Sequence, residues 1–168
     1  MEGVINLNTG INCTGTYTNI LPSPRCWQRW GHGTETVVTA IRDSCNYFFY
    51  DVGYRLSSTG GTYNEEAGLR TLYEYADFFG LTEKSGIEIA ESTPQVSDVD
   101  PVRSAIGQGS NSFTAVGLSR YVSAIANSGT VFDLTLLDHV SDQQGNVLQK
   151  FEPKIRNTVD MPESYWTN

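Results

Sequence analysis

The stretch Ala40-Ile-Arg-Asp-Ser-Cys-Asn-Tyr-Phe-Phe-Tyr50 decides how this 168-residue chain folds, because it marks the break between two helices. The residues before it predict a helix that is capped by Thr34 and ends near Ser44. A second helix is expected to begin around Cys45, since apolar residues then recur at every fourth position as far as Leu56. Four consecutive aromatic residues are expected in the core: Tyr47, Phe48, Phe49 and Tyr50.

Two further helices are predicted downstream. The third is capped by Asn64 and stops at Gly80. Residues 81–112 read as a long irregular connection, and such loops are often functional. The fourth helix runs from about Phe113 to Asn127. Its expected buried face consists of Leu118, Tyr121, Val122, Ile125 and Ala126.

The flanking regions predict short strands. Residues 1–33 are rich in turn formers, and residues 34–130 form the helical core. Within residues 131–160, Leu134 to Val140 and Val147 to Phe151 flank a polar turn, which predicts a β-hairpin. The expected fold is therefore mainly α with short β-hairpins.

Composition excludes several classes of partner. Nineteen acidic against 11 basic residues give a formal net charge of −8. Nucleic acid and anionic lipid bind basic surfaces, so neither is an expected partner. No apolar run approaches the roughly 20 residues of a membrane span, and the first residues lack the basic and apolar regions of a signal peptide. If the parent protein is exported, its targeting segment is expected outside this chain.

The three cysteines leave three alternatives open. They are too few for a disulfide scaffold, so unpaired thiols are the main expectation. Cys13 and Cys26 flank a turn-rich segment and could form one bridge. Cys13, Cys26, His32 and Cys45 have the ligand types of a zinc site, although their spacing matches no finger or ribbon pattern.

The break between the two helices also carries candidate chemistry. Ser44 and Asn46 stand two positions apart, so both can face one cleft. A hydroxyl can relay or orient a proton, and a side-chain amide can both donate to and accept from a substrate amide. Ser and Asn also cap helix ends, so a purely structural role is the alternative at this point.

Three stretches resemble, in the same order, motifs of the transpeptidase domain of penicillin-binding proteins. The first comprises His32-Gly33, Ala40-Ile41 and Ser44-Cys45-Asn46-Tyr-Phe-Phe-Tyr50. The second is Phe79-Gly-Leu-Thr-Glu-Lys-Ser-Gly-Ile-Glu-Ile-Ala-Glu91. The third comprises Ile106-Gly-Gln-Gly109, Thr114, Leu118 and Ala124-Ile-Ala-Asn-Ser-Gly129. The likeness covers about residues 1 to 160, and the start resembles the monofunctional, elongation-type members most.

The resemblance implies the helical lobe of the fold shared by penicillin-binding proteins and serine β-lactamases, here as a partial domain over residues 1–168. It implies a membrane-anchored parent outside the bacterial cytoplasmic membrane that cross-links peptidoglycan through a serine acyl-enzyme and binds β-lactams, without a cofactor. Ser44 would assist proton transfer to the leaving group, and Asn46 would hydrogen-bond the substrate's amide. The implied partners are the stem peptide, β-lactams and the sheet lobe of the same domain.

The sequence departs from the family pattern at the nucleophile. Ser-x-x-Lys occurs nowhere, because the residues three places before the lysines are Leu81, Val147 and Phe151. Lys84-Ser85-Gly86 mimics the Lys-Thr-Gly motif but precedes the Gly-Gln-Gly segment, so we expect a solvated turn there. The chain alone is therefore expected to be incomplete at both ends and inactive. A non-catalytic interaction domain and a β-lactam-sensing or β-lactam-hydrolysing relative are the alternatives.

Other candidates carry less chemistry. His32 is expected to make a loop contact, and His139 to lie on a surface strand. Asp98 and Asp100 lack the ligand spacing of a calcium loop. A surface built to meet another lobe should be apolar and exposed, so we expect dimerisation through it.

Overall fold

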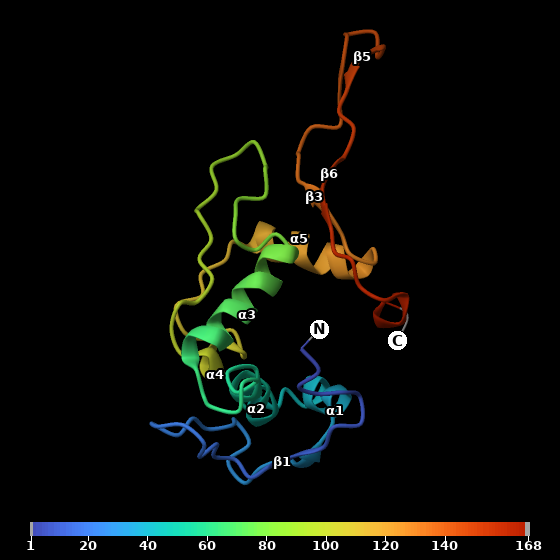
Figure 1. Ribbon diagram of the computed structural model, residues 1–168. Coiled ribbons are helices and arrows are strands. Elements are labelled where there is room, and N and C mark those ends of the chain that lie inside the picture. Colours follow the sequence, from blue (N-terminus) through green and yellow to red (C-terminus); the bar gives the residue numbers. More distant parts are fainter. Residues whose placement is uncertain (1, 167–168) are drawn as a thin grey trace. The chain divides into compact units, whose positions relative to one another are not determined.

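The computed structural model describes residues 2–166 and divides into two compact units (Figure 1). The first unit is Met1–Tyr73 with Ser97–Asn111, and the second is Glu74–Val96 with Ser112–Asn168. Within the described residues, the first unit is mainly helical with one two-stranded sheet, and the second combines one helix and the end of another with two two-stranded sheets. In the described part of the chain, every helix is too short or too polar to cross a membrane.

The first unit builds two helices against a small sheet. Strands β1 (Ile11–Cys13) and β2 (Gly33–Glu35) pair antiparallel. Helix α1 (Val37–Arg42) follows β2, and helix α2 (Asn46–Leu56) begins at the predicted break. Helix α3 (Glu65–Phe78) starts where Asn64 predicts, with the Asn64 side chain accepting from the backbone N–H of Ala67 at 3.1 Å.

The predicted cap of α1 is wrong by two residues. Thr34 lies in β2 opposite Asn12, so backbone pairing takes the residue away from the helix. The N-cap is Thr36, whose backbone N–H donates to the Thr39 hydroxyl at 2.9 Å in a capping box. Glu35 is consequently buried in the strand and does not lie in the helix's first turn.

The predicted aromatic core is confirmed. Phe48 and Tyr50 are buried, and Tyr47 and Phe49 pack partly buried against them. One cluster also contains all three cysteines together with Ile11 and Ala40. Tyr17 and Val102 complete a second cluster around Tyr50. Burial of this apolar surface is what holds the short α1 and α2 in place.

A short helix, α4 (Pro101–Ser104), interrupts the segment predicted to be irregular. It packs closely against α2, where a Cβ on Gly53 would lie 2.7 Å from the carbonyl oxygen of Pro101. Its N-cap is Asp100, which has a left-handed backbone (φ 49°) and accepts from the N–H of Arg103. Proline at the first helical position and a capping Asp together explain this element.

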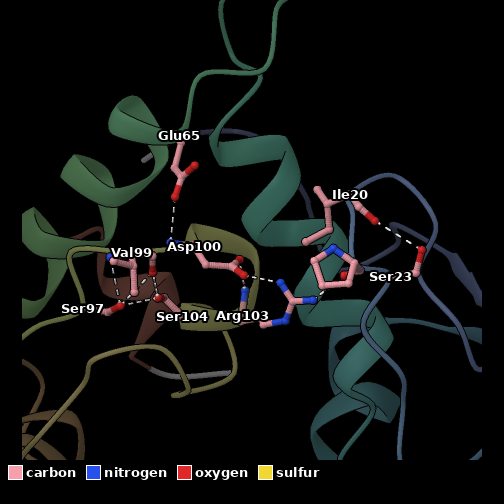
Figure 2. A network of polar contacts seen from close by, with 9 residues as sticks. Ile20, Ser23, Glu65, Ser97, Val99, Asp100, Arg103 and Ser104 are labelled. Atoms are coloured by element: carbon pink, nitrogen blue, oxygen red, sulfur yellow. Dashed lines mark hydrogen bonds and ion pairs between the residues drawn. The ribbon is translucent and has the colours of Figure 1, made fainter.

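Figure 2 shows the polar network that fixes α4. Asp100 pairs with Arg103, which also donates to the carbonyl of Pro22. The backbone N–H of Asp100 donates to Glu65 at 2.9 Å, which ties this loop to the start of α3. Ser97 and Ser104 share a hydrogen bond at 2.7 Å, and both donate to the carbonyl of Val99.

The second unit joins a helix to an extended arm of strands. Helix α5 (Ala115–Ala126) begins at the N-cap Thr114 and leads into β3 (Thr130–Asp133). The strand β3 pairs with β6 (Lys154–Thr158), which the sequence did not predict. The predicted hairpin is present as β4 (His139–Ser141) and β5 (Val147–Lys150) at the far end of the arm (Figure 1), but its first strand begins at His139 and not at Leu134. A single 3-10 turn, η1 (Glu163–Tyr165), follows.

The predicted buried face of α5 is wrong. Leu118, Val122 and Ile125 are exposed, whereas Gly117, Arg120 and Ala124 are buried. The buried face carries a charge because the Arg120 guanidinium reaches the carbonyls of the turn that follows α3. The two terminal nitrogens of Arg120 donate to these carbonyls, whereas its Nε atom is buried without a hydrogen-bond partner among the described residues. A partly satisfied buried arginine thus takes the place that an apolar residue was expected to fill.

The Lys84-Ser85-Gly86 segment is only partly the solvated turn expected. Lys84 is exposed, but Ser85 is completely buried. Its backbone N–H and its hydroxyl donate to the Glu91 carboxylate at 2.8 and 2.9 Å. The second oxygen of Glu91 accepts from the cap residue Thr114 at 2.6 Å, so one carboxylate links this loop to the start of α5.

Candidate functional site: the turn between α1 and α2

The turn that carries Ser44 has the geometry of a Schellman helix end. The N–H of Cys45 donates to the carbonyl of Ala40 at 2.8 Å, and the N–H of Ser44 donates to that of Ile41 at 3.3 Å. Ser44 occupies the left-handed position between them, with φ 51°. Glycine usually holds this position, so a serine there adds backbone strain of about 1 kcal/mol or more. Strain of this kind is often found at functional sites.

The three consecutive residues Ser44, Cys45 and Asn46 have different surroundings. Ser44 is exposed at the tip of the turn, while Cys45 is completely buried and forms the N-cap of α2. Asn46 is half-buried at the first position of α2. The turn thus presents a hydroxyl and an amide on either side of an anchored residue, and it can offer both a proton relay and an amide contact.

Behind this turn lies a cluster of three cysteines and one histidine. Their ligand atoms all lie within 4.8 Å of one another, with the three thiols buried and His32 half-buried. Nδ1 of His32 lies 3.6 Å from the sulfur of Cys13 and 3.6 Å from that of Cys26. Strand β1, the loop before β2 and the start of α2 each contribute to this cluster, which we call the Cys3His cluster.

Two distances in the Cys3His cluster match those of a tetrahedral zinc site. Zn–S bonds of about 2.3 Å and Zn–N bonds of about 2.0 Å place a histidine nitrogen about 3.5 Å from each sulfur. The 3.6 Å distances from Nδ1 of His32 to the sulfurs of Cys13 and Cys26 agree with that value. Thiolate and imidazole donors favour zinc over calcium or magnesium, and four protein ligands make a closed, structural site.

The structure bears on both the disulfide and the metal alternatives for the cysteines. All three cysteines are free, so the Cys13–Cys26 bridge is not formed. The Nε2 atom of His32 is buried and has no hydrogen-bond partner among residues 2–166. Nδ1 faces the sulfurs, so a proton on Nε2 leaves the lone pair of Nδ1 directed at the cluster.

The thiols of the cluster differ in acidity. Burial raises the pKa of the Cys26 thiol, but the backbone N–H groups of Tyr47, Gln28 and Asn46 together hold it below its ordinary value. Burial raises the pKa of the Cys45 thiol to about 12, and the neighbouring Cys13 contributes in the same direction. The start of α2 therefore stabilises negative charge on Cys26, as helix N-termini generally do for thiolates.

The remaining candidates do not assemble with this site. His139 lies on the surface strand β4, as predicted, beside Asp138. Asp98 accepts from the hydroxyl of Ser110, and Asp100 caps α4, so both carboxylates have structural roles. The sequence offers the ligand types of the Cys3His cluster but no local zinc-binding pattern, because the four residues are brought together only by the fold of this unit.

Comparison with known families agrees with the fold. The family profile described as "Penicillin binding protein transpeptidase domain" matches residues 1–168. Penicillin-binding protein 2B from Streptococcus pneumoniae superposes with a TM-score of 0.77 over 99% of this chain and 30% of that chain, at 22% identity. PBP2 in its complex with MreC from Helicobacter pylori superposes with a TM-score of 0.69 over 90% of this chain and 27% of that chain, at 23% identity.

Two curated proteins are similar to this chain in sequence. Stage V sporulation protein D of Bacillus subtilis is 34% identical over 115 residues, which cover 64% of this chain and 16% of that protein. Peptidoglycan D,D-transpeptidase MrdA of Escherichia coli strain K12 is 27% identical over 98% of this chain and 27% of MrdA. The chain thus spans about a quarter of the length of MrdA.

Proposed function

Because this chain belongs to the penicillin-binding protein transpeptidase domain family, we propose that it supplies one wall of the active site of a peptidoglycan D,D-transpeptidase. The supporting observation is the Schellman turn that exposes Ser44 and starts α2 with Asn46. The parent protein acts outside the cytoplasmic membrane and takes a stem peptide as donor. β-Lactams, which imitate that peptide, react at the same site.

In the proposed reaction, a serine from a Ser-x-x-Lys motif elsewhere in the parent attacks the substrate carbonyl. A C–O bond forms, the amide C–N bond breaks, and the departing amine needs a proton. The Ser44 hydroxyl is exposed at the turn and would pass that proton to the amine. The Asn46 amide would hold the substrate's own amide through paired hydrogen bonds.

Labelling with a fluorescent penicillin tests this role in the full-length parent. The unaltered protein should form a covalent adduct that deacylates slowly, and Asn46→Ala should lower the acylation rate by about tenfold or more, equivalent to one lost hydrogen bond. The control is Asn12→Ala, an exposed asparagine in β1. Absence of labelling in the parent would reject the transpeptidase and favour an interaction domain. Rapid deacylation would instead identify a β-lactam-hydrolysing relative.

The Cys3His cluster favours a second, compatible proposal: a structural zinc ion bound by Cys13, Cys26, His32 and Cys45. The supporting observation is the convergence of four soft donors within 4.8 Å in a buried place. When bound, the ion would neutralise the thiolates and cross-link β1 to the start of α2. Its contribution would be to folding, because no coordination position is left for substrate.

Metal content and stability test the zinc proposal without an activity assay. The purified protein should hold one zinc per chain, and His32→Ala should lower both metal content and melting temperature. His139→Ala, on the exposed hairpin, is the matched control and should change neither. A metal-free protein that melts at the same temperature with and without added zinc would contradict the proposal.

A further inference from the structure

A side chain from outside the two helices holds the turn that carries Ser44. The indole N–H of Trp27 donates to the carbonyl oxygens of Asp43 and Ser44, at 3.1 and 3.0 Å. One donor therefore bridges the two consecutive peptide groups that link α1 to α2. Asp43 is the C-cap of α1 and Ser44 lies just beyond it. Carbonyls at such a helix end lack partners within the helix, and here Trp27 supplies one for both.

The directions of these two carbonyls depend on the backbone dihedral angles of Ser44. The residue has φ 51°, and a return to an ordinary backbone region would rotate the flanking peptide groups. The carbonyl of Ser44 could not then face Trp27 together with that of Asp43. Helix α1 has only six residues, so it supplies little stability of its own to oppose such a rotation.

The indole ring is itself held in place on the other side. It packs edge-on against His32, with ring centroids 5.2 Å apart and planes inclined at 66°. Trp27 directly follows Cys26, whose thiol is buried in the Cys3His cluster. The ring is thus held by its backbone connection to Cys26 and by the His32 ring, although 61% of the residue's surface remains exposed.

We propose that Trp27 is a positioning residue, which locks the left-handed turn at Ser44 so that Ser44 and Asn46 keep their places on the active-site wall. The inference rests on the proposed transpeptidase function. The claim that the indole N–H of Trp27 stabilises the left-handed backbone of Ser44 does not depend on that function. Loss of one neutral hydrogen bond corresponds to a five- to tenfold shift in the population of that state.

The discriminating variant is Trp27→Phe, which keeps an aromatic ring against His32 but removes the N–H. The matched control is Trp30→Phe, in the same loop, where the tryptophan is 92% exposed. In the full-length parent, we expect Trp27→Phe to lower the rate constant of penicillin acylation five- to tenfold. Trp30→Phe should leave it unchanged, and the melting temperatures of both variants should agree within about 2 °C.

Hydrogen exchange supplies a readout that a merely structural role would not give. The amides of Ser44 and Cys45 donate within the turn, so their protection should fall about fivefold in Trp27→Phe while that of α2 is retained. Unchanged protection of these two amides would overturn the inference, as would an equal loss of acylation in Trp30→Phe. If the unaltered parent is not acylated, the proposed function fails, and the exchange result alone decides the role of Trp27.

Discussion

The left-handed backbone of Ser44 is a feature of a single residue with consequences for both stability and activity. Ser44 holds the position of a Schellman turn that glycine normally occupies, and it does so in an exposed place where packing demands no particular side chain. A serine that is costly to the fold is best explained by a use for its hydroxyl. Stability and activity should therefore respond in opposite directions to its replacement.

Ser44→Gly tests that opposition. Removing the side chain relieves the left-handed strain, so the unfolding free energy should rise by up to about 1 kcal/mol in urea unfolding. Transpeptidation by the parent should fall, because the hydroxyl is lost. Ser128→Gly is the control, since Ser128 also has a positive φ (62°) after α5. It should gain similar stability and keep its activity; a Ser44→Gly protein with full activity would refute the relay.

Glu91 should make the stability of the second unit depend on pH in the acid range. Burial raises the pKa of this carboxyl, but hydrogen bonds from Thr114 and Ser85 outweigh burial and hold the pKa below its ordinary value of 4.5. A carboxyl with a lowered pKa stabilises the fold above that ordinary value, and the contribution disappears as the pH falls through the folded-state pKa. The melting temperature should therefore drop more steeply below about pH 4.5 in the unaltered protein than in Glu91→Gln.

The control for Glu91 is Glu66→Gln, on the exposed first turn of α3. Its acid response should follow that of the unaltered protein. Equal acid responses of Glu91→Gln and the unaltered protein would show that Glu91 does not carry the stabilising charge.

At the scale of elements, the contact between α2 and α4 depends on Gly53. A methyl group there would meet the carbonyl of Pro101 at 2.7 Å and Val102 at 3.0 Å, and backbone cannot move aside as a flexible side chain does. Gly53→Ala should lower the unfolding free energy by about 1–3 kcal/mol, the usual cost of overpacking. Gly60→Ala, in open space, should change it little. Equal stabilities in denaturant unfolding would show that α4 can move away from α2 at no cost.

Sequence patterns predicted these elements unevenly, for physical reasons. Asn64 and the break at Cys45 are local signals, and the helices begin where they indicate. Thr34 and the short α4 depend on pairing and packing with distant residues, which a local pattern does not contain. On α5, the apolar row around Val122 lies outside and Arg120 inside, because carbonyls after α3 accept hydrogen bonds from the two terminal nitrogens of its guanidinium.

In the candidate site, too, features with a local sequence signal were predicted, and features that depend on distant residues were not. The order of motifs predicted the position of Ser44 and Asn46 at a helix break, because that signal is local. The Cys3His cluster spans residues 13 to 45 and becomes visible only when β1 and the start of α2 meet. Trp27 has no sequence signal at all, since a tryptophan before a turn usually marks packing.

Taken over its full length, the chain contains no Ser-x-x-Lys motif, which the proposed chemistry needs. Every serine in it is followed at the third position by a residue other than lysine. Fluorescent penicillin should therefore leave this 168-residue chain unlabelled under conditions that label the full-length parent. A penicillin adduct that mass spectrometry locates on a specific serine of this chain would contradict the proposal that the nucleophile lies elsewhere in the parent.

The alternation of exposed Ser44, buried Cys45 and half-buried Asn46 has an evolutionary consequence. If this turn forms the proposed active-site wall, an inhibitor bound there can touch Ser44 and Asn46 but not the buried Cys45. Substitutions at the middle position would act on the drug indirectly, by disturbing the core. Under that proposal, heritable resistance that arises along these three codons should be confined to the outer two.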